Sequence, residues 1–153
     1  MGLVRFLHLL ALGLWVGEIA FFSFVVAPVI FASVPERAGD VVGGIFPRYY
    51  ALGTAAATVA LVSSLILVRR ASAPGWWRGV TICVALGLAA MLWAGVVVHP
   101  KAQRLRVTLQ AAGEVPATNH AFRRAHRDAV LLNAAALIAG LAGLGLSAGA
   151  LRQ

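Results

Sequence analysis

Few side chains in this 153-residue sequence could do chemistry, because most of the chain is apolar. His99 and His126 could supply two imidazoles from different segments, and imidazole is a common ligand of haem iron, copper and zinc. His8 could ligate a haem together with one further group. The sequence has no HxxxH, CxxC or Glu-x-x-His pair, so hydrogen-bonded histidines near lipid headgroups, with His8 as an interfacial residue, are the alternative interpretation.

Glu18 is the one acid within the longest apolar run, which extends over residues 3–33. An ionised carboxylate near the middle of a bilayer costs about 3 kcal/mol. Glu18 is therefore either a protonated, hydrogen-bonded structural residue or a group that relays protons, coordinates a cation or pairs with a buried cation. The helical period places His8, Trp15, Glu18 and Phe22 on one stripe, which we expect to face a bundle interior or a wet cavity.

A second set of polar residues is predicted to meet where the ends of four helices come together on one face of the membrane. Phe122, His126, Ala129 and Asn133 follow i, i+4, i+7, i+11 spacing, so His126 and Asn133 are expected to point the same way, into the bundle. This polar corner consists of Arg48, Tyr49, His99, Lys101, Arg123, His126 and Asn133. With the stripe, it gives the candidate ligand-binding residues Arg48, Tyr49, His126, Asn133, Glu18 and Trp15, and the candidate metal ligands His8, His99 and His126.

Hydropathy and flanking charge predict the helices that position these residues, since about 20 apolar residues suffice to cross a bilayer. Four spans are predicted, near residues 3–33, 49–68, 80–98 and 129–151. Residues 35–43 are predicted to form a short interfacial helix, and Thr118 is predicted to cap the last helix. His8 then lies on the opposite face from His99 and His126, so these three side chains are not expected to hold one small ion together.

The predicted fold class is all-α: an integral membrane four-helix bundle, formed by a single domain of residues 1–153, with helical extensions on one face. Shares of 61% hydrophobic and 12% charged residues exclude an ordinary soluble domain. The net charge of +8 comes from basic residues beside apolar runs, so membrane lipids rather than nucleic acid are the expected partners. Cys83 is the only cysteine, which excludes an intrachain disulfide.

The predicted topology follows from the even number of spans, which places both termini on one side of the membrane. The basic residues favour cytoplasmic connectors and external termini, in a bacterial inner membrane. The spacing of Gly145 and Gly149 gives the last helix a small-residue seam, for packing within the chain or for a homo-oligomer.

Two short patches of the chain resemble the transmembrane protein 205-like family, also described as domain of unknown function 4149. The residues that carry this resemblance are His8, Trp15-x-Gly17, Pro28, Phe46-Pro47-x-Tyr49-Tyr50, Phe122, His126 and Asn133. The chain departs from the family at residues 127–130, where the family has small and hydroxyl residues. The resemblance implies the handling of a metal ion or metal complex, because eukaryotic members are associated with resistance to platinum drugs.

The opening of the first helix, with His8 and then Trp15-x-Gly17, is also distantly similar to the copper-resistance protein D and membrane protoporphyrinogen oxidase groups. This second resemblance implies a haem between the helices. The function expected from the sequence is therefore the binding or handling of a haem, metal ion or metal complex. The alternatives are a membrane oxidoreductase acting on a porphyrinogen or quinone, and a structural or assembly subunit without a ligand, since no complete catalytic motif is present.

Overall fold

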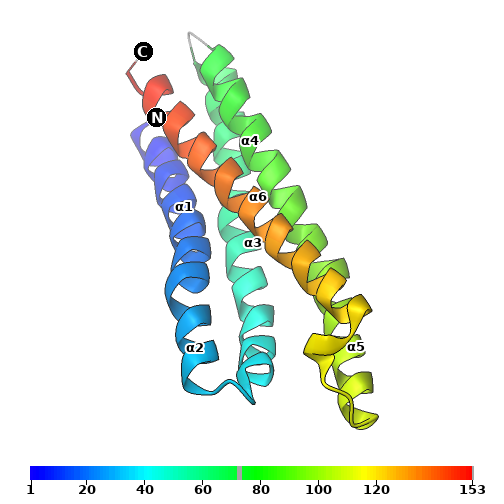
Figure 1. Cartoon of the computed structure of the whole chain (residues 1–153). Coiled ribbons are helices and arrows are strands. Elements are labelled where there is room, and N and C mark those ends of the chain that lie inside the picture. Colours follow the sequence, from blue (N-terminus) through cyan, green and yellow to red (C-terminus); the bar gives the residue numbers. More distant parts are fainter. Residues whose placement is uncertain (72–73, 153) are drawn as a thin grey trace.

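The chain folds into a bundle of four long helical segments in a computed structural model that describes residues 1–71 and 74–152 (Figure 1). The first segment runs through α1 (Gly2–Phe21), the π-helical turn η1 (Phe22–Val26) and α2 (Ala27–Ser33). The second is α3 (Ala38–Arg70). The third runs through α4 (Pro74–Trp93), the π-helical turn η2 (Ala94–Val98) and α5 (His99–Ala111). The 3₁₀ turn η3 (Pro116–Thr118) then leads to α6 (His120–Ala150).

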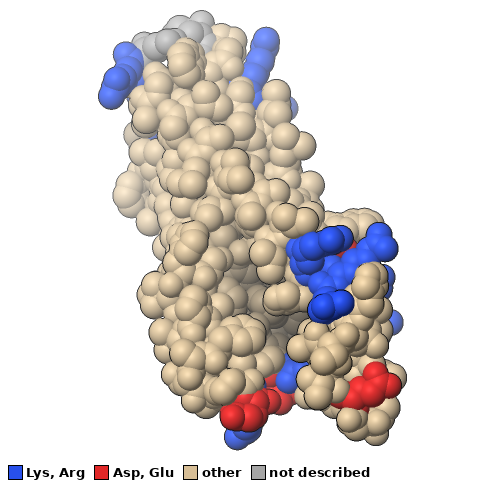
Figure 2. Space-filling model, viewed as in Figure 1, with Lys and Arg blue, Asp and Glu red and all other residues tan. Residues whose placement is uncertain are grey.

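Each segment is long and apolar enough to cross a membrane, with a mean hydropathy of 2.1 to 2.3 over its most apolar stretch. The described residues include no strand. Figure 2 shows the charged side chains gathered towards the two ends of the molecule, with uncharged surface over the length between them. Phe6, Phe24, Leu86 and Ile138 are among the large apolar side chains exposed on the surface, where they suit contact with lipid. The predicted all-α membrane fold with four spans is confirmed.

The second segment differs from its prediction, because α3 is continuous from Ala38 to Arg70 and Pro47 lies inside it. The prediction of a separate interfacial helix over residues 35–43 is therefore wrong. Proline removes one backbone hydrogen bond but does not prevent a helix that other contacts support. Here Gly39 and Gly43 lie directly against side chains of α5, so close packing on that helix holds the turns before Pro47.

The last two segments also begin at residues other than those predicted. The third starts at Pro74 instead of near residue 80, with the proline in its first turn. The cap of α6 is Asn119, whose side-chain oxygen accepts hydrogen bonds from the backbone of Ala121 and Phe122. Thr118 belongs to the preceding 3₁₀ turn, and its hydroxyl donates to a backbone carbonyl there, so Thr118 is not the cap.

Around the bundle the segments follow the order α1, α3, α4 and α6, and both termini lie at the same end (Figure 1). The first turns of α6 lie beside α5, at the far end from the termini. Trp15 of α1 is fully buried at the centre, where Gly87 of α4 and Gly140 of α6 make room for its ring. In the predicted small-residue seam, Gly149 packs on α4, whereas the Cβ position of Gly145 faces open space.

Candidate functional site

His8 of α1 is fully buried in the half of the bundle nearer the termini. Its Nδ1 lies 3.1 Å from the carbonyl oxygen of Ala60 and 3.0 Å from the hydroxyl of Ser63, both on α3. Its Nε2 lies 3.0 Å from the hydroxyl of Ser147 on α6, and its ring packs edge-on against Trp77 of α4. All four segments therefore meet at His8, whose side chain lies inside the bundle.

The hydrogen bonds of His8 fit two protonation states of its ring. The Ala60 carbonyl can only accept, so Nδ1 carries a hydrogen in either state. The Ser147 hydroxyl also lies 2.7 Å from the carbonyl oxygen of Gly143. A neutral ring accepts at Nε2 from Ser147, whereas a protonated ring donates to Ser147, whose hydroxyl then donates to Gly143. A metal ion on His8 would have to displace one of these partners.

Glu18 and Trp15 lie deeper in the bundle, on the stripe that was predicted to face its interior. The indole N–H of Trp15 donates to the sulfur of Met91 over 3.2 Å. Glu18 has one buried carboxylate oxygen, Oε2, which makes no hydrogen bond within the described residues. A Cβ added to Gly53 of α3 would stand 3.0 Å from this oxygen and would also meet the end of Met91. Glu18 and Met91 therefore converge at Gly53, and the carboxylate is left without a donor.

Tyr49 and Asn133, two residues of the predicted polar corner, are joined directly. The Tyr49 hydroxyl donates to the side-chain oxygen of Asn133, whose amide nitrogen donates to the Ser23 hydroxyl over 3.0 Å. Rings of Phe22 and Phe46 pack on Tyr49, with centroids 5.0 and 5.9 Å away. This cluster links the first, second and fourth segments in the half of the bundle away from the termini.

Replacing Tyr49 by phenylalanine is expected to lower the free energy of unfolding by about 1 kcal/mol, because interhelical side-chain hydrogen bonds in membranes contribute about that much. A double-mutant cycle of Tyr49→Phe and Asn133→Ala should give a coupling energy of similar size. Thr58→Val is the control, because the exposed Thr58 hydroxyl bonds only a carbonyl of its own helix. A coupling energy of zero would contradict the link between these helices.

His126 does not reach the polar corner, so the expectation that it points into the bundle with Asn133 is wrong. It is exposed and its ring stacks flat on Phe122 of the same helix. Residues seven apart differ by about 20° in direction around a helix. Asn133 already lies at the edge of the buried stripe, so His126 falls outside it, and Ala125 takes the inner position. Arg48 is exposed as well, and its guanidinium donates to a carbonyl one turn earlier.

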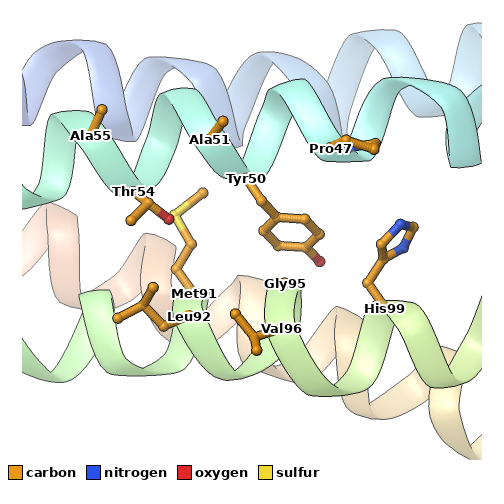
Figure 3. A pocket seen from close by; sticks show the side chains of 10 residues that line it. All are labelled: Pro47, Tyr50, Ala51, Thr54, Ala55, Met91, Leu92, Gly95, Val96 and His99. Carbon is orange, nitrogen blue, oxygen red and sulfur yellow. The ribbon is translucent and has the colours of Figure 1, made fainter.

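A groove of about 550 Å³ lies between α3 and the third segment (Figure 3). Its lining consists of Pro47, Tyr50, Ala51, Thr54, Ala55, Met91, Leu92, Gly95, Val96 and His99. Tyr50 of α3 and His99 of α5 project into it from opposite walls, with ring centroids 5.8 Å apart. Gly95 makes room for the Tyr50 ring, and the small side chains of Ala51 and Ala55 form part of the lining. The groove thus has an apolar length and a polar end.

His99 of this groove was predicted as a site residue from the sequence, whereas its neighbours Tyr50 and Met91 were not. A stripe of small residues on α3 opposite Gly95 was the available signal, but the stripe alone does not say which helix faces it. The three candidate metal ligands are not brought together, because His8 is in the other half of the bundle and His126 is on the surface. Within residues 1–71 and 74–152, no three His, Cys, Asp or Glu side chains could hold one metal ion.

A comparison with protein-family models gives one finding for this chain. A model described as a domain of unknown function (DUF4149) matches residues 10–111, about two thirds of the chain. The matched part includes Glu18, Tyr50, Met91 and His99, which lie in or beside the groove. No curated protein and no solved structure matches the chain.

Proposed function

This chain belongs to the DUF4149 family, and we propose that it is an integral membrane protein that binds a small lipophilic ligand between its helices, in the groove between α3 and the third segment. The observation that carries this proposal is the convergence of polar groups on an apolar groove of ligand size. Figure 3 shows Tyr50 and His99 at one end, Thr54 farther along α3 with Ala51 between, and Ala55 beyond Thr54.

The polar end of the groove is free to meet a ligand. Neither Tyr50 nor His99 has a side-chain hydrogen bond to any other residue within the described part of the chain. Ala51, Leu92 and Val96 are exposed on helices whose surroundings are lipid, so the ligand enters from the bilayer rather than from water. An amphipathic molecule fits this groove best, with its apolar body beside the alanines and its polar group towards Tyr50 and His99.

Photoaffinity labelling in lipid nanodiscs tests the proposal, with a neutral alkyl alcohol that carries a diazirine as the probe. We expect peptide mapping to find the label on the groove residues of α3 and η2. Ala51→Trp fills the groove and should reduce labelling about tenfold, since the bound ligand has no room left. Val59→Trp, on the exposed side of α3 and outside the groove, is the matched control. Equal labelling of both variants would contradict the proposal.

A haem or metal complex is a narrower form of the same proposal, favoured by the resemblance to the transmembrane protein 205-like family. His99 is the one candidate metal ligand that lines the groove, so it would supply a single imidazole while the rest of the complex packs on the apolar wall. Added haem should then compete with the alcohol for the wild-type protein but not for His99→Ala. If haem did not compete, the proposal of a haem or metal complex would be contradicted, and the proposal of another lipophilic ligand would stand.

We also propose that residues 1–153 are one membrane domain, placed in a bacterial inner membrane with cytoplasmic connectors and external termini. Eight of the basic residues flank the two longer connectors and five flank the termini and the short loop, which supports this orientation.

A further inference from the structure

We propose that the ligand of the groove is a lipophilic cation and that Glu18 is the counter-ion for its charged group. This inference rests on the proposed function and specifies the chemistry of the ligand. Its basis is the position of the half-buried Glu18, whose buried oxygen Oε2 lies close behind the groove wall, and of the Met91 side chain that separates this oxygen from the groove.

Glu18 has no cation of its own within the described residues. The ion pairs present there join Arg106 to Asp40 and Arg127 to Asp128, and all four residues belong to the connector end of the molecule. The buried oxygen of Glu18 makes no hydrogen bond either. A carboxylate in a medium of low polarity gains most from a group that brings a positive charge or a hydrogen-bond donor. The bundle thus offers a strong acceptor that the protein leaves unpaired.

Met91 separates the groove from this carboxylate. Its side chain lines the groove, and its terminal methyl group lies in the notch that Gly53 leaves beside Glu18. Methionine is unbranched and turns easily about its side-chain bonds. The hydrogen bond from Trp15 to the Met91 sulfur holds it in the closed position, and sulfur is a weak acceptor. A rotation of Met91 would therefore connect the groove to Glu18 without any movement of a helix.

The ring of Tyr50 favours a positive group over a neutral one, because Tyr50 lines the groove. Aromatic faces attract cations, most strongly where water is excluded. The other four acids of the sequence lie in or beside the connectors, so Glu18 is the acid that a ligand in the groove could reach. A monovalent cation is therefore the ligand that fits.

An anionic ligand is the competing choice, because Lys101 and Arg104 line a neighbouring hollow of about 470 Å³ on α5. That hollow meets the groove at Val96. Both basic side chains are exposed, so water and lipid headgroups already stabilise their charges. The buried oxygen Oε2 of Glu18 has no such partner, and this difference favours the cation.

The experiment compares three probes with the same diazirine-bearing alkyl chain, ending in a primary ammonium, an alcohol or a carboxylate. Each is titrated against the protein in zwitterionic nanodiscs, and labelling of the groove peptides is measured. The ammonium probe should bind the wild-type protein about tenfold more tightly than the alcohol, because a carboxylate pairs more strongly with a positive charge than with a neutral O–H donor. Glu18→Gln should abolish this preference, and alcohol labelling of the groove peptides that persists in this variant shows that it folds.

Met91→Ala tests the passage, since it opens the way to Glu18 and should speed ammonium labelling relative to the wild type. Equal binding of ammonium and alcohol, or an ammonium preference that survives in Glu18→Gln, would overturn the inference and leave the proposed function standing. Tighter binding of the carboxylate probe would overturn it in favour of an anionic ligand. If the groove takes up none of the three probes, the proposed function itself fails, and the inference fails with it.

Discussion

Replacing His8 by alanine is expected to lower the free energy of unfolding by about 3 kcal/mol, measured by unfolding in mixed detergent micelles. The ring is fully buried and bonds helices α3 and α6 through Ser63 and Ser147. Each such bond contributes about 1 kcal/mol in a membrane. The remainder comes from the void beside Trp77, because a buried side chain that is removed leaves its neighbours without contacts.

Leu10→Ala is the matched control, since Leu10 is exposed on the same helix and faces lipid. Its unfolding free energy should stay within about 0.5 kcal/mol of the wild type. The combination of His8→Ala with Ser147→Ala should cost less than the sum of the two single changes, because both remove the same hydrogen bond. A His8→Ala protein as stable as the wild type would mean that His8 lies at the membrane interface.

The four spans could be predicted because crossing a bilayer needs only length and apolar character, both of which are local properties of the sequence. The residue at which the second span begins could not be predicted, because it depends on packing between distant parts of the chain. Gly43 lies against Gln103 and Gly39 against Arg106, about sixty residues later. These contacts carry the helix through Pro47, which local rules treat as a break.

The residues of the candidate site could likewise be predicted only in part. The stripe of Trp15 and Glu18 was predicted correctly as facing inward, because its direction follows from the helical period alone. The partners could not be predicted, since Trp15 meets Met91 across 76 residues and His8 meets Ser147 across 139. Those pairings depend on the order of helices around the bundle, which hydropathy does not report.

Gly87→Ala should lower the free energy of unfolding by about 2 kcal/mol, because an added methyl group has no space at the centre of the bundle. Its Cβ would stand 2.5 Å from the Trp15 ring and 3.0 Å from the Cβ of Ala139. Trp15 is fully buried and its N–H is bonded to Met91, so the ring cannot turn aside without losing that bond. The same unfolding measurement in mixed micelles gives the result.

Gly145→Ala is the control for the same chemical change in a helix, because no atom of another helix lies within 4 Å of its Cβ position. It should be neutral or slightly stabilising, since alanine favours helix by about 1 kcal/mol over glycine. Trp15→Phe introduced into Gly87→Ala should recover part of the loss, because the smaller ring frees the space that the methyl group needs. If Gly87→Ala and Gly145→Ala were equally stable, the Trp15 ring would not reach α4. The hydrogen bond that holds Met91 closed over Glu18 would then be absent as well.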